Sequence, residues 1–188
     1  MTRIVSGFAR SLALEVPSHG TRPTSDRVRE ALFSALDSRG ALDAAHVLDL
    51  YAGSGALGLE AVSRGATRAT LVESNPNAAA VCSRNARAIA QRAHSGTTPE
   101  ISVRNQRVET FLARTVEHYD LVFIDPPYAV TNSTLYGVLE MVIPLLSSHS
   151  FVCVERSTRD GELLLPQELS TVVMRSYGET TLHYVELV

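Results

Sequence analysis

From residue 46 onward, apolar segments rich in β-branched and aromatic residues alternate with amphipathic segments of helical period. The apolar segments are typical of buried strands and span residues 46–51, 69–73, 101–106, 119–125 and 151–157. Helices are predicted between them, over residues 56–65, 75–93, 108–114 and 133–148. Such alternation predicts a parallel sheet with helices on both faces, whose ligands bind at the carboxyl ends of the strands near the switch in strand order.

Both ends of the chain depart from this alternation. Residues 171–188 read as two further strands that turn at Gly178, which makes one of them antiparallel and brings the predicted sheet to seven strands. Residues 3–16 resemble a small β-ribbon, and a helix is predicted to start near Thr24, where Thr24 or Ser25 can cap it. We therefore expect an extension over residues 1–20 and one α/β domain over residues 21–188.

Composition limits the class of protein. A chain of 188 residues with 45% apolar residues can bury one sizeable core. No segment is long and apolar enough for a bilayer, and the first residues, "MTRIVSGFAR", lack the pattern of a signal peptide, so a cytoplasmic protein is expected. Cys82 and Cys153 fall in a predicted helix and strand and suit reduced core residues. The six histidines show no ligand spacing, so no metal is expected.

A glycine-rich turn follows the first strand of the alternating region. The segment "DLYAGSGALGLEA" places Asp49 at the strand end and satisfies G-x-G-x-x-G with glycines that let the backbone approach a nucleotide. Glu73 lies 20 residues after Gly53, at the end of the next strand, where a carboxylate can accept both ribose hydroxyl protons. NAD-binding folds share this pattern. However, Asp49 would repel a pyrophosphate and suits the amino group of a methionine moiety, which favours S-adenosylmethionine.

The segment "DPPY" ends the strand over residues 119–125. Two prolines stop the strand and leave a rigid turn that carries the Asp125 carboxylate and the Tyr128 ring. An exocyclic amine is a poor nucleophile, so its methylation depends on positioning more than on a strong base. We predict that Asp125 and the Pro126 carbonyl accept the two amine protons, and that Tyr128 stacks on an unstacked base. The alternative is that this segment is only a strand-stopping turn.

Five segments together resemble the RsmD family of 16S ribosomal RNA guanine-N2 methyltransferases: "RPTSDRVREALF", "DLYAGSGALGLEA", "VESN", "FIDPPY" and "VERS…RSYGETTLHYVEL". The resemblance covers nearly the whole chain and implies a Rossmann-like class I methyltransferase fold. It implies an enzyme, expected to be a monomer, that methylates 16S rRNA within a small ribosomal subunit or its assembly intermediate. The implied catalytic residues are Asp125, Pro126, Pro127 and Tyr128. The implied cofactor-binding residues are Thr24, Asp49, Tyr51, Gly53, Gly55, Glu73, Ser74, Arg107, Val108 and Asp125.

One position departs from the family. Where the family often has an acidic residue, this chain has Arg107, preceded by Gln106 and followed by Val108, whose backbone can still hydrogen-bond adenine. The alternatives are amino methylation of DNA adenine or protein glutamine, which share the "DPPY" chemistry, and a non-catalytic RNA-binding module. The sequence shows no separate domain for reading the base edges of DNA.

Basic residues are concentrated near the N-terminus. The net charge of the chain is −3, yet residues 1–39 contain six arginines and four acidic residues. Guanidinium groups pair with phosphate oxygens, and this segment precedes the cofactor domain, so we predict an RNA-binding surface there. The residues of this predicted surface are Arg3, Arg10, Arg22, Arg27 and Arg29. The alternative for Arg27 and Arg29 is a solvated helix face.

Overall fold

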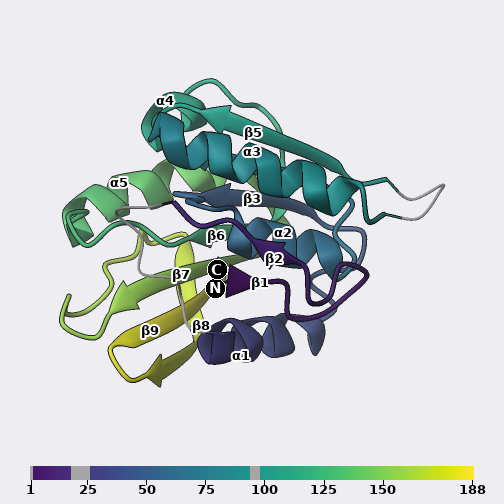
Figure 1. Cartoon of the computed structure of the whole chain (residues 1–188). Coiled ribbons are helices and arrows are strands. Elements are labelled where there is room, and N and C mark those ends of the chain that lie inside the picture. Colours follow the sequence, from purple (N-terminus) through teal and green to yellow (C-terminus); the bar gives the residue numbers. More distant parts are fainter. Residues whose placement is uncertain (1, 18–25, 94–97) are drawn as a thin grey trace.

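The computed structural model describes residues 2–17, 26–93 and 98–188. Its main feature is a seven-stranded sheet with the order β5-β4-β3-β6-β7-β9-β8 (Figure 1). In chain order, the strands are β3 (His46–Leu50), β4 (Arg68–Glu73), β5 (Glu100–Asn105), β6 (Tyr119–Ile124), β7 (Leu146–Ser157), β8 (Leu169–Tyr177) and β9 (Thr180–Leu187).

The direction of the strands confirms the predicted mostly parallel sheet. Strands β5, β4, β3, β6 and β7 run parallel, and β9 is antiparallel to both of its neighbours, β7 and β8. The hairpin turns at Gly178, which has a φ of 60°. The chain extends the sheet from β3 to β5 on one side and then returns to β6 on the other. The strand order therefore reverses between β3 and β6, which is where such folds bind ligands.

Helices cover both faces of the sheet, as predicted. One face is covered by α1 (Asp26–Asp37), α2 (Ala56–Ser63) and α3 (Pro76–Ala90), and the other by α4 (Val108–Leu112) and α5 (Asn132–Val142). Alternate residues of a strand point to opposite faces. Val47 of β3 therefore packs in the core cluster with α1, α2 and α3, while Leu48 packs in the other cluster with α4 and α5.

The predicted helix over residues 133–148 is too long. In the structure α5 ends at Val142, a 3-10 turn covers Ile143–Leu145, and β7 begins at Leu146. Pro144 has no backbone N–H and cannot continue the helical hydrogen bonds, so the chain leaves the helix here. Leu146 instead pairs with Tyr119 of β6.

The N-terminal ribbon is present but short. Strands β1 (Thr2–Arg3) and β2 (Ala13–Leu14) pair antiparallel. The chain between them is fixed to α2, because the fully buried Glu60 carboxylate accepts hydrogen bonds from the backbone N–H groups of Val5 (2.7 Å) and Ser6 (2.9 Å). The predicted boundary between residues 20 and 21 lies outside the described residues.

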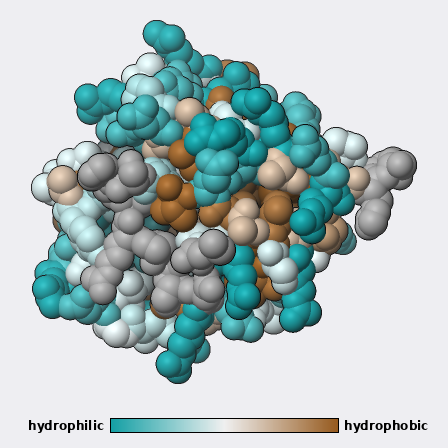
Figure 2. Space-filling model, viewed as in Figure 1, coloured by the Kyte–Doolittle hydropathy of each residue, from teal (hydrophilic) through white to brown (hydrophobic). Residues whose placement is uncertain are grey.

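The N-terminal segment lies at the front of the view shared by Figures 1 and 2. Hydrophobic residues gather near the centre of this face and hydrophilic residues surround them. Phe8 and Val16 are each 37% exposed. None of the helices in the described part of the chain combines the length and apolar character needed to cross a membrane.

Candidate active site

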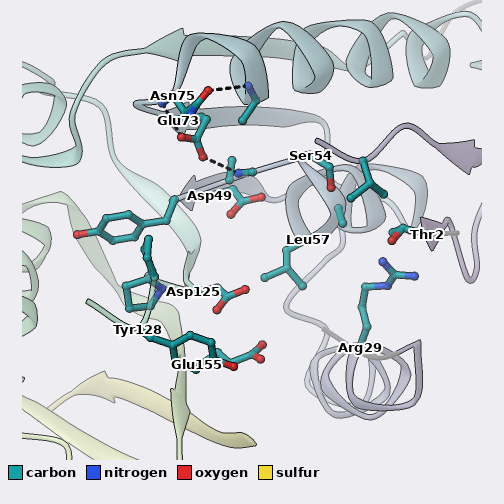
Figure 3. A pocket seen from close by; sticks show the side chains of 18 of the residues that line it. Thr2, Arg29, Asp49, Ser54, Leu57, Glu73, Asn75, Asp125, Tyr128 and Glu155 are labelled. Carbon is teal, nitrogen blue, oxygen red and sulfur yellow. Dashed lines mark hydrogen bonds between the residues drawn. The ribbon is translucent and has the colours of Figure 1, made fainter. Parts of the chain in front are cut away.

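A pocket of about 420 Å³ lies where the strand order reverses, at the carboxyl ends of β3, β4, β6 and β7. Each of these strand ends contributes one carboxylate. The four carboxylates belong to Glu73 of β4, Asp49 of β3, Asp125 after β6 and Glu155 of β7 (Figure 3). The pocket brings together most of the predicted site residues: Asp49, Tyr51, Gly53, Glu73, Ser74, Asp125, Pro126, Pro127 and Tyr128.

The alternation of side chains along a strand explains why the four carboxylates converge. Leu71, Phe123 and Cys153 all pack in the core cluster that α1, α2 and α3 cover. A residue two positions further along a strand points to the same face. Glu73, Asp125 and Glu155 therefore extend this face beyond the core and into the pocket. Asp49 does the same, because it lies two residues after Val47 of the same core cluster.

Asp49 is the most buried of the four acids, at 1% exposure. Its Oδ2 accepts a hydrogen bond from the backbone N–H of Gly58 at 2.9 Å. A Cβ on Gly58 would lie 2.2 Å from Leu71 and 3.2 Å from Asp49, so only glycine lets α2 approach this closely. Burial raises the pKa of Asp49 to about 7; the Gly58 hydrogen bond opposes this rise and the Glu73 carboxylate adds to it. A ligand with a positive charge would compensate for this buried carboxylate.

The glycine turn orients Glu73. The backbone N–H of Gly53 donates to Glu73 Oε2 at 2.9 Å, and that of Asn75 donates to Oε1 at 2.7 Å. Tyr51 and Gly53 both have positive φ, of 63° and 56°, which folds the turn back toward β4. Both carboxylate oxygens are therefore held in place and keep further lone pairs for the hydroxyl groups of a ligand.

The turn after β6 lies at the pocket rim. Pro126 is buried, Asp125 is half-buried, and the Tyr128 ring is 71% exposed. The backbone N–H of Val130 donates to the Pro127 carbonyl at 2.9 Å and closes the turn. This places an acid inside the pocket and an aromatic surface at its opening.

Arg29 corrects one sequence prediction. It was predicted on an exposed RNA surface, but it is 1% exposed and lines the pocket (Figure 3). Its Nη2 donates to the backbone carbonyl of Arg3 at 2.6 Å. The spacing of Arg29, Leu32, Phe33 and Leu36 would have revealed this, since residues three and four apart share a helix face and the other three are buried. Arg29 gives a pocket lined by acids a buried positive charge.

The remaining predicted residues lie elsewhere. Gly55 caps the N-terminus of α2 with a φ of 82°, where a Cβ would lie 2.8 Å from Cys82 Sγ. Arg107 is exposed and pairs with Glu109 at 3.5 Å; neither it nor the buried Val108 lines the pocket. Arg3, Arg10 and Arg27 are exposed, whereas Arg22 and Thr24 lie outside the described residues. Among the described residues, no group of three or more histidine, cysteine, aspartate or glutamate side chains is placed to hold a metal ion.

Comparison with known proteins identifies the family. The family model described as "Conserved hypothetical protein 95" matches residues 2–186. The chain is 38% identical over 158 residues to "Ribosomal RNA small subunit methyltransferase D" of Escherichia coli, covering 81% of this chain and 70% of the relative. The protein of the same name from Haemophilus influenzae is 31% identical, over 94% and 89% of the two chains. The solved structure of yhhF from Escherichia coli is similar with a TM-score of 0.83 and 30% identity, covering 98% of this chain and 97% of that one. This chain belongs to the RsmD family.

Proposed function

We propose that this protein transfers the methyl group of S-adenosylmethionine to the exocyclic N2 of a guanine in 16S ribosomal RNA of the small subunit. The observation that carries this proposal is that the Asp125–Tyr128 turn opens onto the same pocket as Asp49 and Glu73. The relatives named as small-subunit ribosomal RNA methyltransferases support the choice of substrate. The methyl acceptor would enter past Tyr128, and the cofactor would lie deeper.

The charges of the pocket fit S-adenosylmethionine. Its α-ammonium group would compensate for the Asp49 carboxylate, whose pKa is raised mainly by burial. Its carboxylate would pair with the buried Arg29 guanidinium. Its ribose hydroxyls would donate to Glu73, which the backbone N–H groups of Gly53 and Asn75 already orient. A pyrophosphate would meet the Asp49 carboxylate, which argues against NAD.

The protein's role in methyl transfer is to position the amine. When bound, the cofactor supplies an electrophilic methyl group on its sulfonium. The Asp125 carboxylate and the Pro126 carbonyl would accept the two N2 protons, so that the nitrogen lone pair faces this methyl. The Tyr128 ring, exposed at the rim, would stack on the base after it leaves the RNA helix. Tyr128→Phe should therefore be mild, and Tyr128→Ala should weaken capture of the RNA.

The exposed arginines of the N-terminal region would bind RNA phosphates. Arg3, Arg10 and Arg27 are exposed, and the main chain of Arg3 contacts Arg29, which lines the pocket. Phosphate contacts fix the orientation of a protein on its nucleic acid without reading sequence. These side chains would thus hold the substrate while the pocket receives one nucleotide.

The experiment that tests the function is genetic deletion followed by mapping of methylated nucleotides. Mass spectrometry of 16S ribosomal RNA from the deletion strain should show the loss of one N2-methylguanosine. Purified protein and labelled S-adenosylmethionine should restore it on isolated small subunits, whereas the Asp125→Ala variant should not. An unchanged N2-methylguanosine pattern would refute the proposal, and a lost methyl group on adenine or on a protein glutamine would redirect it.

A further inference from the structure

Two of the carboxylates at the strand ends, those of Asp125 and Glu155, lie next to each other on the side where the methyl acceptor would enter. Ile124 of β6 is the register partner of Val154 of β7, so the next residues, Asp125 and Glu155, lie side by side. Adjacent strands are about 4.8 Å apart, which brings the two side chains to the same part of the pocket. Figure 3 shows both carboxylates together, with Asp49 between them and Glu73.

The backbone around Glu155 is firmly held. Strand β7 pairs with β6 on one side and with β9 on the other, where Glu155 is the partner of Leu182. The next residue, Arg156, points to the opposite face, donates to the carbonyl of Val130 at 3.0 Å and pairs with Asp160 at 3.1 Å. The position of Glu155 is therefore set by the sheet, as a residue that reads a substrate requires.

We propose that Glu155 is the residue that selects guanine, by accepting a hydrogen bond from N1–H of the target base. This inference rests on the proposed guanine-N2 activity. On the Watson–Crick edge of guanine, the N1–H donor lies beside the N2 amine, so this part of the edge presents donors only. With the amine held by Asp125 and the Pro126 carbonyl, N1–H is the next donor along the edge. Two neighbouring carboxylates, which only accept, complement this pattern.

The same geometry rejects a purine whose N1 has a lone pair. Adenine and 2-aminopurine both have an acceptor at N1, which would face the Glu155 carboxylate and leave both groups without a proton between them. Sites that hydrogen-bond one substrate group reject analogues that lack it by roughly four to five orders of magnitude. The Asp125–Tyr128 turn suits any exocyclic amine. Glu155 would thus be the residue that makes the site prefer guanine.

The test compares two target nucleotides in the intact enzyme reaction. Small subunits are reconstituted with 16S ribosomal RNA that carries, at the mapped target position, either guanosine or 2-aminopurine riboside. The analogue keeps the N2 amine, replaces N1–H with a lone pair and lacks the O6 carbonyl, a loss that is the same for every protein variant compared. The rate of labelled methyl transfer is measured at limiting substrate for wild-type protein and for Glu155→Gln. Glu140→Gln is the matched control, because Glu140 is exposed on α5 outside the pocket and its replacement removes the same charge.

The preference for guanosine over the analogue is the decisive quantity, since general effects on folding or cofactor binding cancel in this ratio. Wild type and Glu140→Gln should prefer guanosine by at least about 100-fold. Glu155→Gln should reduce this preference by at least about tenfold, because its carboxamide can turn an N–H toward the N1 lone pair.

Two other outcomes would contradict either the role of Glu155 or the proposed function. A preference in Glu155→Gln within about twofold of wild type, even with a slower overall reaction, would contradict the inference while leaving the guanine-N2 activity intact, since a purely structural role slows both substrates alike. Failure of the wild-type protein to methylate guanine N2 in the reconstituted subunits would refute the proposed function itself.

Discussion

The buried Asp49 carboxylate predicts that cofactor binding strengthens as the pH rises toward 7. In the cofactor-free protein, burial raises the pKa of Asp49 from its ordinary 3.8 to about 7. The cofactor's ammonium group would bind the deprotonated form, so well below pH 7 each binding event must release about one proton. With a pKa of about 7, the deprotonated fraction falls about 15-fold between pH 7 and pH 5.5, and affinity should fall with it, by about 1.6 kcal/mol.

Calorimetry with S-adenosylhomocysteine at pH 5.5, 6.0, 6.5 and 7.0 measures this dependence. Buffers of different ionisation enthalpy should reveal about one proton released at pH 5.5. In Asp49→Asn the pH dependence should disappear, while Asp43→Asn, at an exposed position between α1 and β3, should keep it. A flat affinity in the wild type, or the same slope in Asp49→Asn, would refute the pairing of Asp49 with the ammonium group.

The same pKa has a consequence for folding. The pKa of Asp49 is higher in the folded protein than in the unfolded chain, so its contribution to stability is complete below pH 3.8 and is lost as the pH rises through about 7. At pH 8 the cofactor-free Asp49→Asn variant should therefore be more stable than wild type by up to about 4 kcal/mol in urea denaturation. The amide oxygen that this substitution introduces can still accept the hydrogen bond from the backbone N–H of Gly58.

Four further changes test other parts of the molecule. Asp125→Ala should keep cofactor affinity and lower the single-turnover methylation rate by roughly two to three orders of magnitude, as for one lost transition-state acceptor; a wild-type rate would make the turn merely structural. Arg29→Met should weaken S-adenosylhomocysteine binding by roughly 10- to 100-fold in calorimetry, since a charged hydrogen bond is lost; unchanged affinity would exclude the proposed carboxylate contact. Replacing Arg3 and Arg10 together by Ala should reduce the slope of log K for RNA binding against log salt concentration by about two, without changing cofactor affinity. An unchanged slope would show that neither side chain contacts an RNA phosphate. Glu60→Ala should lower the free energy of unfolding by roughly 3 to 5 kcal/mol in urea, because Arg64 and two backbone N–H groups lose their buried partner; a loss below about 1 kcal/mol would contradict this.

Sequence reasoning predicted the sheet because strand and helix patterns are local. Runs such as the one over residues 119–125 contain their own signal, and so does the hairpin at Gly178. The helix predicted over residues 133–148 was wrong at its C-terminal end. Pro144 indicates a helix end there, but the helical spacing of apolar residues continues beyond it. There, pairing of Leu146 with β6 decided the outcome, and such pairing depends on a segment more than 20 residues away.

Charged residues were the harder case, because a charge is expected at the surface unless a partner is known. Arg29 and Glu60 both lie on buried helix faces, and both bind backbone groups of the N-terminal segment. Nothing in the spacing of that segment predicts that it crosses α2. Glu155 is part of the segment "VERS", which sequence analysis placed in a strand. Because β7 is buried on both faces, alternation along the strand could not predict that this side chain enters the pocket.

The proposed division of the pocket into a cofactor side and an acceptor side depends on strand order, which alternation alone does not determine. Along the chain the acids occur as Asp49, Glu73, Asp125 and Glu155, but across the sheet they lie in the order of β4, β3, β6 and β7. The return of the chain from β5 to β6 places Asp125 beside Asp49, so the amine would be held next to the methionine end of the cofactor. Glu73 and Glu155 then fall at opposite ends of the row, where one would face the ribose and the other the target base. A right-handed crossover of β6 to the far edge, beyond β5, would have kept every motif and separated the acceptor from the methyl group.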